Sequence, residues 1–210
     1  MTINYIESQS VLIIVNNEKL EKKKFRGTLY LDRDGVIIED FGYVGDKTKV
    51  RLIPSAKKFM TIARSSGYLI AVITNQSGVG RGYYTWNDYI EVTNKMNLML
   101  GKEATPDIII ACGVRPNSEC GGERFRKPNT GMIDYIRNNF AKVENNFEIL
   151  IGDKLSDIQC GLKANIKINI HVHTGHGSKE RDYVKKEMNS GSDNFIKLAE
   201  DLSEIIELIS

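Results

Sequence analysis

The stretch TLYLDRDG at residues 28–35 decides how the rest of the sequence is interpreted. Its first five residues form a short apolar run that ends in a carboxylate, which predicts a buried strand at 28–32. Side chains alternate along a strand, so Asp32 and Asp34 can both reach a crevice at its carboxyl end. Gly35 lets the chain turn sharply. An ordinary turn explains these residues equally well, because aspartate and glycine are favoured in turns.

Short apolar strands and helical segments alternate on either side of this stretch. Further strands are expected at residues 68–73, 107–112, 147–151 and 168–172, and helices at 54–65, 85–100, 130–140, 156–164 and 193–209. Strands that are apolar along their whole length and separated by helices predict a parallel sheet covered on both faces. We therefore expect a doubly wound α/β fold, in which ligands bind beyond the carboxyl ends of the strands.

The N-terminal segment lies outside this alternation. We expect an extension at residues 1–26, followed by one α/β domain at 27–210. Within the extension, the apolar run 11–15, Asn16-Asn17 and the charged stretch 18–26 are compatible with a small hairpin. The lysine run at 22–24 is interpreted as solvated surface.

Composition narrows the choice of partners. The 210 residues include 29 Lys and Arg against 27 Asp and Glu, a net charge of +2, which gives no electrostatic reason to expect nucleic acid or membrane. The apolar runs are far shorter than the roughly 20 residues of a membrane span, and no secretory signal is recognised. Three cysteines argue against a disulfide framework and favour the cytoplasm. The oligomeric state stays open.

Polar residues also follow the other predicted strands. Thr74 comes directly after the strand 68–73, where its hydroxyl and the following N–H groups are suited to a phosphate. Asp153 follows the strand 147–151, and with Asp32 it would supply the hard oxygen ligands that Mg²⁺ prefers. Taken alone, each has a simpler interpretation, a polar loop for the threonine and helix initiation for the aspartate.

Two further signals lie near helix starts. Arg126 and Lys127 precede the helix 130–140 and suit phosphate, the arginine as a fork and the lysine as a point charge; a solvated basic loop is the alternative. Asp157 is explained equally well as part of a site or as a favourable first-turn charge. The order of all these groups along the chain, each at a strand end or a helix start, is hard to obtain by chance.

Five stretches resemble a known family of enzymes. They are LDRDGVIIEDFGYV (31–44), ITNQSGVGRGYY (73–84), RKPNTGM (126–132), IGDKLSDIQCGLKA (151–164) and HTG (173–175). The chain is similar to phosphatases of the haloacid-dehalogenase superfamily, and within it to the branch that acts on heptose bisphosphates and histidinol phosphate. The resemblance covers about residues 28–175.

The resemblance implies roles for individual residues. Asp32 would attack phosphorus to give an aspartyl-phosphate, and Asp34 would first protonate the leaving oxygen and then activate water. Mg²⁺ would be held by Asp32, the Asp34 carbonyl and Asp153, with Asp157 in support. Thr74 and Lys127 would bind the transferred phosphoryl oxygens. The substrate-binding residues implied are Asp40, Tyr43, Thr74, Asn75, Gln76, Ser77, Arg126, Lys127 and Lys154.

The same resemblance implies a substrate. It is a small phosphorylated sugar, namely a heptose 1,7-bisphosphate that loses its 7-phosphate in nucleotide-activated heptose synthesis; histidinol phosphate or another small phosphosugar is the alternative. The connection 36–51 is too short for a folded cap domain, so we expect an open site.

The sequence departs from this branch at its zinc-binding loop. Cys112 is present, but Val114 stands at the histidine position, and Glu123 and Phe125 stand at two cysteine positions. Cys120 lies at a different spacing. Two thiols do not complete a tetrahedral structural site, so we expect no zinc.

Two functions from different classes share part of this pattern. A phospho-receiver switch also places an acceptor aspartate, a hydroxyl and a lysine around a parallel sheet, but it has no need of an acid at Asp34. A catalytically silent binding module is the other. The histidines His171, His173 and His176 are interpreted as surface or loop residues and not as a metal cluster, because no further ligand lies nearby at a suitable spacing.

Overall fold

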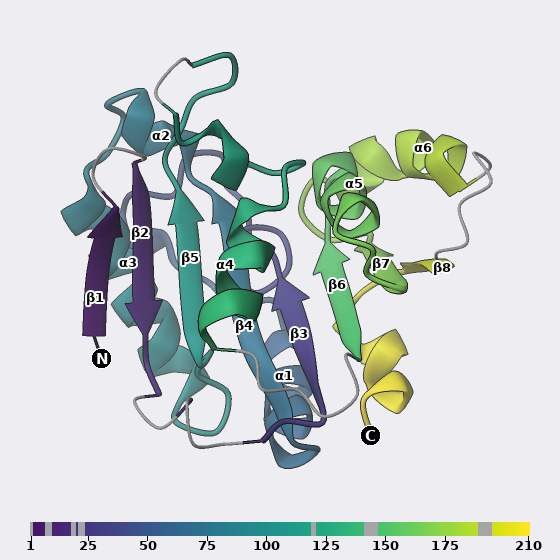
Figure 1. Ribbon diagram of the computed structural model, residues 1–210. Helices are drawn as coiled ribbons and strands as arrows, with labels where there is room; N and C mark the ends of the chain where they lie inside the picture. The colour runs from purple at the N-terminus through teal and green to yellow at the C-terminus, as the bar shows by residue number, and fades with distance from the viewer. Residues whose placement is uncertain are drawn as a thin grey trace.

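The computed structural model contains one eight-stranded sheet with helices on both faces (Figure 1). It describes residues 2–6, 10–17, 20, 24–118, 121–140, 147–188 and 195–210. The strand order is β1-β2-β5-β4-β3-β6-β7-β8, and neighbours from β5 to β8 are parallel. The strands are β1 (Thr2–Ile6), β2 (Val11–Val15), β3 (Gly27–Leu31), β4 (Tyr68–Asn75), β5 (Ile108–Cys112), β6 (Glu148–Gly152), β7 (Ile168–Val172) and β8 (Phe195–Ala199).

The expected doubly wound α/β arrangement is confirmed by two cores on opposite faces of the sheet. Leu29 and Leu31 of β3 belong to one core and Tyr30 to the other, as the alternation along a strand requires. The first core is closed by α1 (Ala56–Ser65), α3 (Trp86–Leu100) and the 3-10 helix η5 (Leu202–Leu208). The second is closed mainly by α4 (Gly131–Asn139), which lies in front of the sheet in Figure 1.

The buried face and the end of α1, and the start of α3, have the residues expected there. On α1, Phe59, Met60 and Ala63 recur at helical spacing and are fully buried. Burying a side chain of the size of Phe59 is worth about 1.5–3 kcal/mol. Gly67, just beyond this helix, has φ +86, which a residue with a side chain rarely adopts. Thr85 caps α3 in a capping box, with reciprocal hydrogen bonds to Asp88.

The N-terminal residues add to the edge of the same sheet. A hairpin does form within residues 1–26, but it joins β1 to β2 and therefore lies before Asn16-Asn17, not around it. All five residues of β2 are buried, and the strand pairs antiparallel with β5. Residues 18, 19 and 21–23, which include most of the charged stretch, lie outside the described part.

The expected helix at 193–209 is wrong. Residues 193–194 lie outside the described part, and the rest divides into β8, parallel to β7, and η5. Pairing with the edge of the sheet buries Ile196 and Ala199 at strand positions. The apolar residues Leu202 and Ile205 then pack into the core near α1 as a tighter 3-10 helix.

Within the described residues, no cap domain covers the carboxyl edge of the sheet. Between β3 and α1 the chain forms only η3 (Lys47–Lys49) and the isolated bridges Asp34–Ile38 and Ile38–Leu52. The remaining elements are α2 (Ser77–Gly80), η4 (Glu123–Phe125), α5 (Leu155–Lys163) and α6 (Gly177–Met188). Over the ranges that the structure describes, no helix has the length and apolar character to span a bilayer.

Candidate active site

The carboxyl ends of three adjacent strands bring the main predicted residues together. Asp32 follows the central strand β3, Thr74 lies near the end of β4, and Asp153 follows β6. All three are buried, at 5%, 1% and 0% exposure. Lys127, which precedes α4, is 3% exposed and reaches the same place. Burying polar and charged groups costs free energy, and a buried cluster of them is typical of a functional site. This edge of the sheet is therefore the candidate active site.

Three carboxylates form the centre of the site. Asp32, Asp153 and Asp157 each have an oxygen within 4.8 Å of the others. The Oδ2 atom of Asp153 accepts a hydrogen bond of 2.7 Å from the main-chain N–H of His176. Its Oδ1 atom is buried without a hydrogen-bond partner in the described part of the chain. Hard oxygen atoms in this number, one of them unpartnered, fit a divalent cation such as Mg²⁺.

Two glycines make room for Asp153. A Cβ atom on Gly35 or on Gly175 would collide with its carboxylate, and both residues have positive φ, +86 and +60. Glycine is therefore needed at each position for two reasons, the positive φ of the backbone and the close approach of the Asp153 carboxylate.

Burial and the neighbouring charges shift the pKa values of the three acids in different directions. Burial raises the pKa of Asp153 to about 8, the charges of Asp32 and Asp157 add to this, and Lys154 opposes it. Burial also raises the pKa of Asp157. For Asp32, burial is outweighed by Lys127 and Lys154, which hold its pKa below the usual range. Among the three acids, Asp32 is therefore the one whose surroundings lower the pKa and favour the ionised carboxylate without a metal.

Lys127 is fixed from three sides. Its Nζ atom donates to Asp32 at 2.7 Å and to the carbonyl of Ile73 at 2.8 Å, and it lies 2.7 Å from Asp157. Its main chain is clamped by Asn75, whose amide exchanges two hydrogen bonds of 3.0 Å with the backbone of Lys127. Asp157 has a second contact, a hydrogen bond from the N–H of Lys154 that caps α5. The Asp157 carboxylate therefore caps the helix and also contacts Lys127 in the site.

Arg33 is a site residue that the sequence interpretation missed. It is fully buried and grips Asp34 through hydrogen bonds of 2.9–3.1 Å, while its guanidinium lies 4.7 Å from the centre of the Tyr89 ring. Gln76 donates to the same Asp34 carboxylate at 2.7 Å. Burial raises the pKa of Asp34, against the charge of Arg33. An arginine between two aspartates at a strand end was the available signal.

A cavity of about 350 Å³ opens in front of this cluster. Thr74 and Lys127 are buried and do not line it. The residues that line it include most of those predicted to bind substrate: Asp34, Asp40, Gly42, Tyr43, Asn75, Gln76, Ser77, Tyr84, Arg126, Lys154, Ser156 and His176.

The histidines only partly follow their prediction. His171 is not a surface residue: it is fully buried in β7, with its Nε2 atom 2.9 Å from the carbonyl of Asp153. Burial lowers its pKa to about 4, so it stays neutral at physiological pH. His173 pairs with the exposed Glu200. His176 lines the cavity, 3.1 Å from Asp40, which also pairs with Lys154. Periodicity alone places β7 but does not reveal this contact with the site.

The loop at the predicted zinc position is held by packing. Phe125 and Val114 are each 2% exposed and belong to the second core. Arg126 donates to the carbonyl of Val114 at 3.0 Å, and Arg124 stacks over the Phe125 ring. Cys120 lies outside the described residues.

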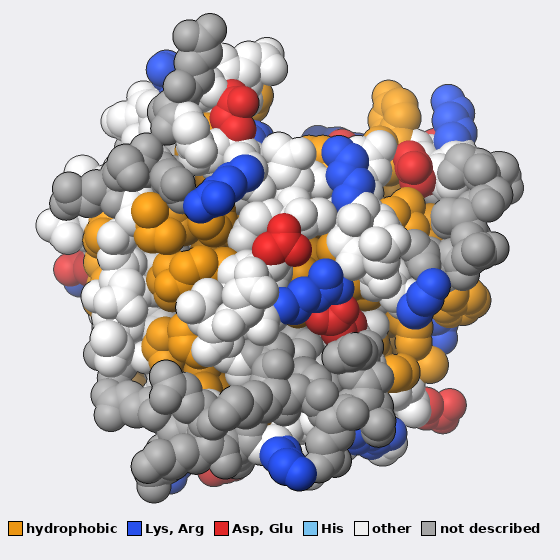
Figure 2. Space-filling view, viewed as in Figure 1, with side chains coloured by type: hydrophobic (Ala, Val, Ile, Leu, Met, Phe, Trp, Pro, Cys, Tyr) orange, Lys and Arg blue, Asp and Glu red, His pale blue; other side chains and the backbone are white. Residues whose placement is uncertain are grey.

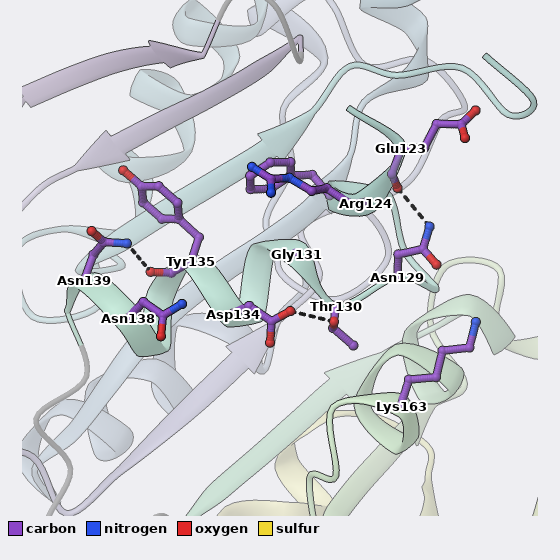
Figure 3. A pocket seen from close by; sticks show the side chains of 11 residues that line it. Glu123, Arg124, Asn129, Thr130, Gly131, Asp134, Tyr135, Asn138, Asn139 and Lys163 are labelled. Carbon is purple, nitrogen blue, oxygen red and sulfur yellow. Dashed lines mark hydrogen bonds between the residues drawn. The ribbon is translucent and has the colours of Figure 1, made fainter. Parts of the chain in front are cut away.

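A larger cavity, of about 690 Å³, lies over α4 and η4 (Figure 3). None of the predicted site residues lines it. Its polar side chains bond within its own wall: Asn129 to the carbonyl of Glu123, Thr130 to Asp134, and Asn139 to the carbonyl of Tyr135. Basic side chains on this face are scattered and do not gather in one patch (Figure 2). The carboxyl edge therefore remains the candidate site.

Comparison with known proteins gives consistent results. The family model described as "Polynucleotide kinase 3 phosphatase" matches residues 40–189. A D-glycero-alpha-D-manno-heptose-1,7-bisphosphate 7-phosphatase of Burkholderia mallei is 38% identical over 143 residues, covering 66% of this chain and 75% of the relative. A D-glycero-D-manno-heptose-1,7-bisphosphate 7-phosphatase of Chlorobaculum tepidum is 37% identical over 161 residues, covering 72% and 80%.

Solved structures agree with these relatives. The crystal structure of a D,D-heptose 1,7-bisphosphate phosphatase from B. bronchiseptica, complexed with magnesium and phosphate, has a TM-score of 0.72 at 25% identity, covering 87% of this chain and 97% of that one. A HAD-like phosphatase from Mesorhizobium loti has a TM-score of 0.77 at 24% identity, covering 99% and 96%, and supports the fold.

Proposed function

We infer that this chain, which belongs to the haloacid-dehalogenase superfamily of phosphatases, removes the 7-phosphate of D-glycero-D-manno-heptose 1,7-bisphosphate. One observation carries the chemistry: a buried Asp32 held ionised by Lys127, in a cluster of acids that fits a divalent cation. The names of the relatives that match most of the chain support the substrate.

The first step is attack on phosphorus. An oxygen of the ionised Asp32 forms the new P–O bond while the bond to the sugar oxygen breaks, which leaves an aspartyl-phosphate and an alcohol. Thr74 would donate to the phosphoryl oxygens, where the transferred charge is spread, and Lys127 would do so with the N–H that bonds the Asp32 carboxylate before substrate enters. Lys127 is suited to this, because the charges of Asp157 and Asp32 outweigh burial and keep its pKa raised.

Asp34 would handle the protons. In its acid form it protonates the departing sugar oxygen, and as a carboxylate it then takes a proton from the water that hydrolyses the aspartyl-phosphate, so the two transfers balance. Burial supports the acid form, because it raises the pKa of Asp34.

The residues that would hold Mg²⁺ are Asp32, Asp153 and the main chain of Asp34, with Asp157 beside them. When bound, the ion would offset the repulsion between the Asp32 carboxylate and the phosphate dianion.

Arg126 would recognise the second phosphate of the substrate. It lines the cavity, and within the described residues it forms no ion pair. Burial, together with the charge of Arg81, lowers its pKa, so an anion beside the guanidinium would stabilise the charged form. A phosphate at the far end of a sugar would supply one.

A phosphate-release panel tests this function. We expect the highest kcat/KM with the heptose 1,7-bisphosphates, and a value at least about tenfold lower with histidinol phosphate and with a 3′-phosphorylated oligonucleotide. A long-lived phosphorylated protein that releases no phosphate would favour the receiver switch instead.

Mg²⁺ is expected to stabilise the fold through Asp153. At 100 times its Kd, a ligand adds about 2.7 kcal/mol, which for this size of chain corresponds to a rise in Tm of about 5–10 °C. Because Asp153 carries a proton below about pH 8, Mg²⁺ must displace it. The apparent affinity should fall about tenfold per unit as the pH is lowered below this value. Calorimetry with and without Mg²⁺ measures both; an unchanged response in Asp153→Asn would contradict the assignment.

We also propose that the chain holds no structural zinc. Valine, glutamate and phenylalanine occupy positions 114, 123 and 125, and two of these side chains are buried among apolar residues. Elemental analysis of the purified protein is expected to find less than about 0.1 zinc per chain. One tightly bound zinc per chain would show that other residues complete a site.

A further inference from the structure

The side-chain amide of Gln76 has every hydrogen-bonding position occupied by the protein. Its Nε2 atom donates to Asp34 at 2.7 Å and to the Thr74 hydroxyl at 2.8 Å. Its Oε1 atom accepts from the Tyr84 hydroxyl at 2.6 Å and from Arg33 at 3.1 Å. A glutamine amide offers two donors and two acceptor lone pairs, so none is left for a ligand. The residue is also only 2% exposed.

These partners allow only one orientation of the amide. A guanidinium can only donate, so the side of Gln76 that faces Arg33 must be the oxygen. The nitrogen is then directed at Asp34 and Thr74. Arg33 cannot rotate away easily, because it is fully buried between the Asp34 carboxylate and the Tyr89 ring. Tyr84 closes the other side, where Gly78 leaves room for its ring.

This arrangement also sets the hydroxyl hydrogen of Thr74. Its oxygen already accepts a hydrogen bond from Gln76, so the hydroxyl hydrogen can point to another acceptor. In the proposed reaction that acceptor is a phosphoryl oxygen. One amide therefore directs two groups, the acid at Asp34 and the donor at Thr74.

We propose that Gln76 is a positioning residue that orients the Asp34 carboxyl group and the Thr74 hydroxyl together, and that it does not bind the substrate. This inference rests on the proposed phosphatase mechanism and corrects the role that the sequence resemblance implies for this residue. Arg33 and Tyr84 hold the amide in place.

The main test is Gln76→Met, which keeps the length of the side chain and removes the amide. Two substrates separate its effects: the heptose bisphosphate, whose alkoxide must be protonated as it leaves, and p-nitrophenyl phosphate, whose leaving group needs little protonation. The ratio kcat/KM reports steps up to departure of the leaving group. General acid catalysis contributes about 10²–10⁴-fold, so we expect the loss to be at least about tenfold larger for the sugar phosphate, with its KM changed by less than about threefold.

A double-mutant cycle identifies the partner. On an Asp34→Asn background, Gln76→Met should remove no more than the small share that acts through Thr74, because the acid is already gone. Tyr84→Phe removes one of the two bonds that hold the amide oxygen and should show a smaller loss of the same kind. Thr105→Val is the matched control: it removes a partly buried hydrogen bond to the carbonyl of Gly101, none of whose partners belongs to this network, and should leave both substrates unaffected.

The outcomes are distinguishable. A rise of tenfold or more in KM for the sugar phosphate with kcat unchanged would make Gln76 a substrate ligand. Equal losses for both substrates, repeated on the Asp34→Asn background, would make its role structural. If Gln76→Met fails to fold, the pattern in Tyr84→Phe decides. A wild-type chain that hydrolyses neither substrate would overturn the proposed function itself, whereas preference for another sugar phosphate would leave this test in place with that substrate.

Discussion

Replacing Asp32 by asparagine should lower phosphate release by at least about 10⁴-fold, the scale on which enzymes lose rate with their nucleophile. The amide is a poor nucleophile, and it also removes an anion from the cluster of Asp32, Asp153 and Asp157. Steady-state assays with the heptose bisphosphate measure the loss. Rapid quenching should trap a phosphorylated wild-type protein and none of the variant.

The same variant should keep its fold. Lys127 retains its contact with Asp157 and its hydrogen bond to the Ile73 carbonyl, so it is not left as an isolated buried charge. Loss of one of three crowded carboxylates also relieves repulsion. We expect similar melting temperatures for the two proteins. Substantial remaining turnover in a folded Asp32→Asn protein would assign the nucleophile elsewhere.

Lys127→Met should impair both stability and activity. The substitution keeps a chain of similar length, but it leaves Asp32 and Asp157 buried without their cation. Breaking one partner out of a buried ion pair costs about 3–5 kcal/mol, which urea unfolding followed by circular dichroism will measure. Turnover should fall at least about 10³-fold, because the charge on the phosphoryl group loses a donor.

Lys163→Met is the matched control for this prediction. Lys163 ends α5 on the exposed surface, so its loss should change the free energy of unfolding by less than about 0.5 kcal/mol. Added Mg²⁺ should recover part of the stability of Lys127→Met, because it supplies positive charge to the same acids. If both lysine variants were equally stable without Mg²⁺, the buried cluster would carry far less charge than its geometry implies.

Local sequence patterns were sufficient for the central sheet. The strands β3 to β7 are mostly apolar because both faces of the sheet are covered, and that pattern is visible without any tertiary information. The tail was interpreted wrongly because its apolar spacing suits a helix, whereas the free edge of β7 selects a strand for Phe195–Ala199. The helix and strand propensities of the residues carry no information about which edge of the sheet is available for pairing.

The site was predictable to the extent that its residues follow strands. Asp32, Thr74 and Asp153 come together because neighbouring parallel strands end at one edge. Arg33, Tyr84 and His176 were missed because their roles depend on contacts across distant segments, such as Arg33 with Gln76 and His176 with Asp40. The role of a buried arginine can be assigned only when its hydrogen-bond partners are known.

Because Asp32, Thr74 and Asp153 lie at the ends of the three central strands β3, β4 and β6, fraying of the sheet edges cannot separate these three residues. Strands in the middle of a sheet exchange their amide hydrogens only on global unfolding, whereas rims such as β1 and β8 fray at low cost. Catalysis should therefore persist until the whole sheet melts, and the heat-inactivation curve should follow the loss of secondary structure.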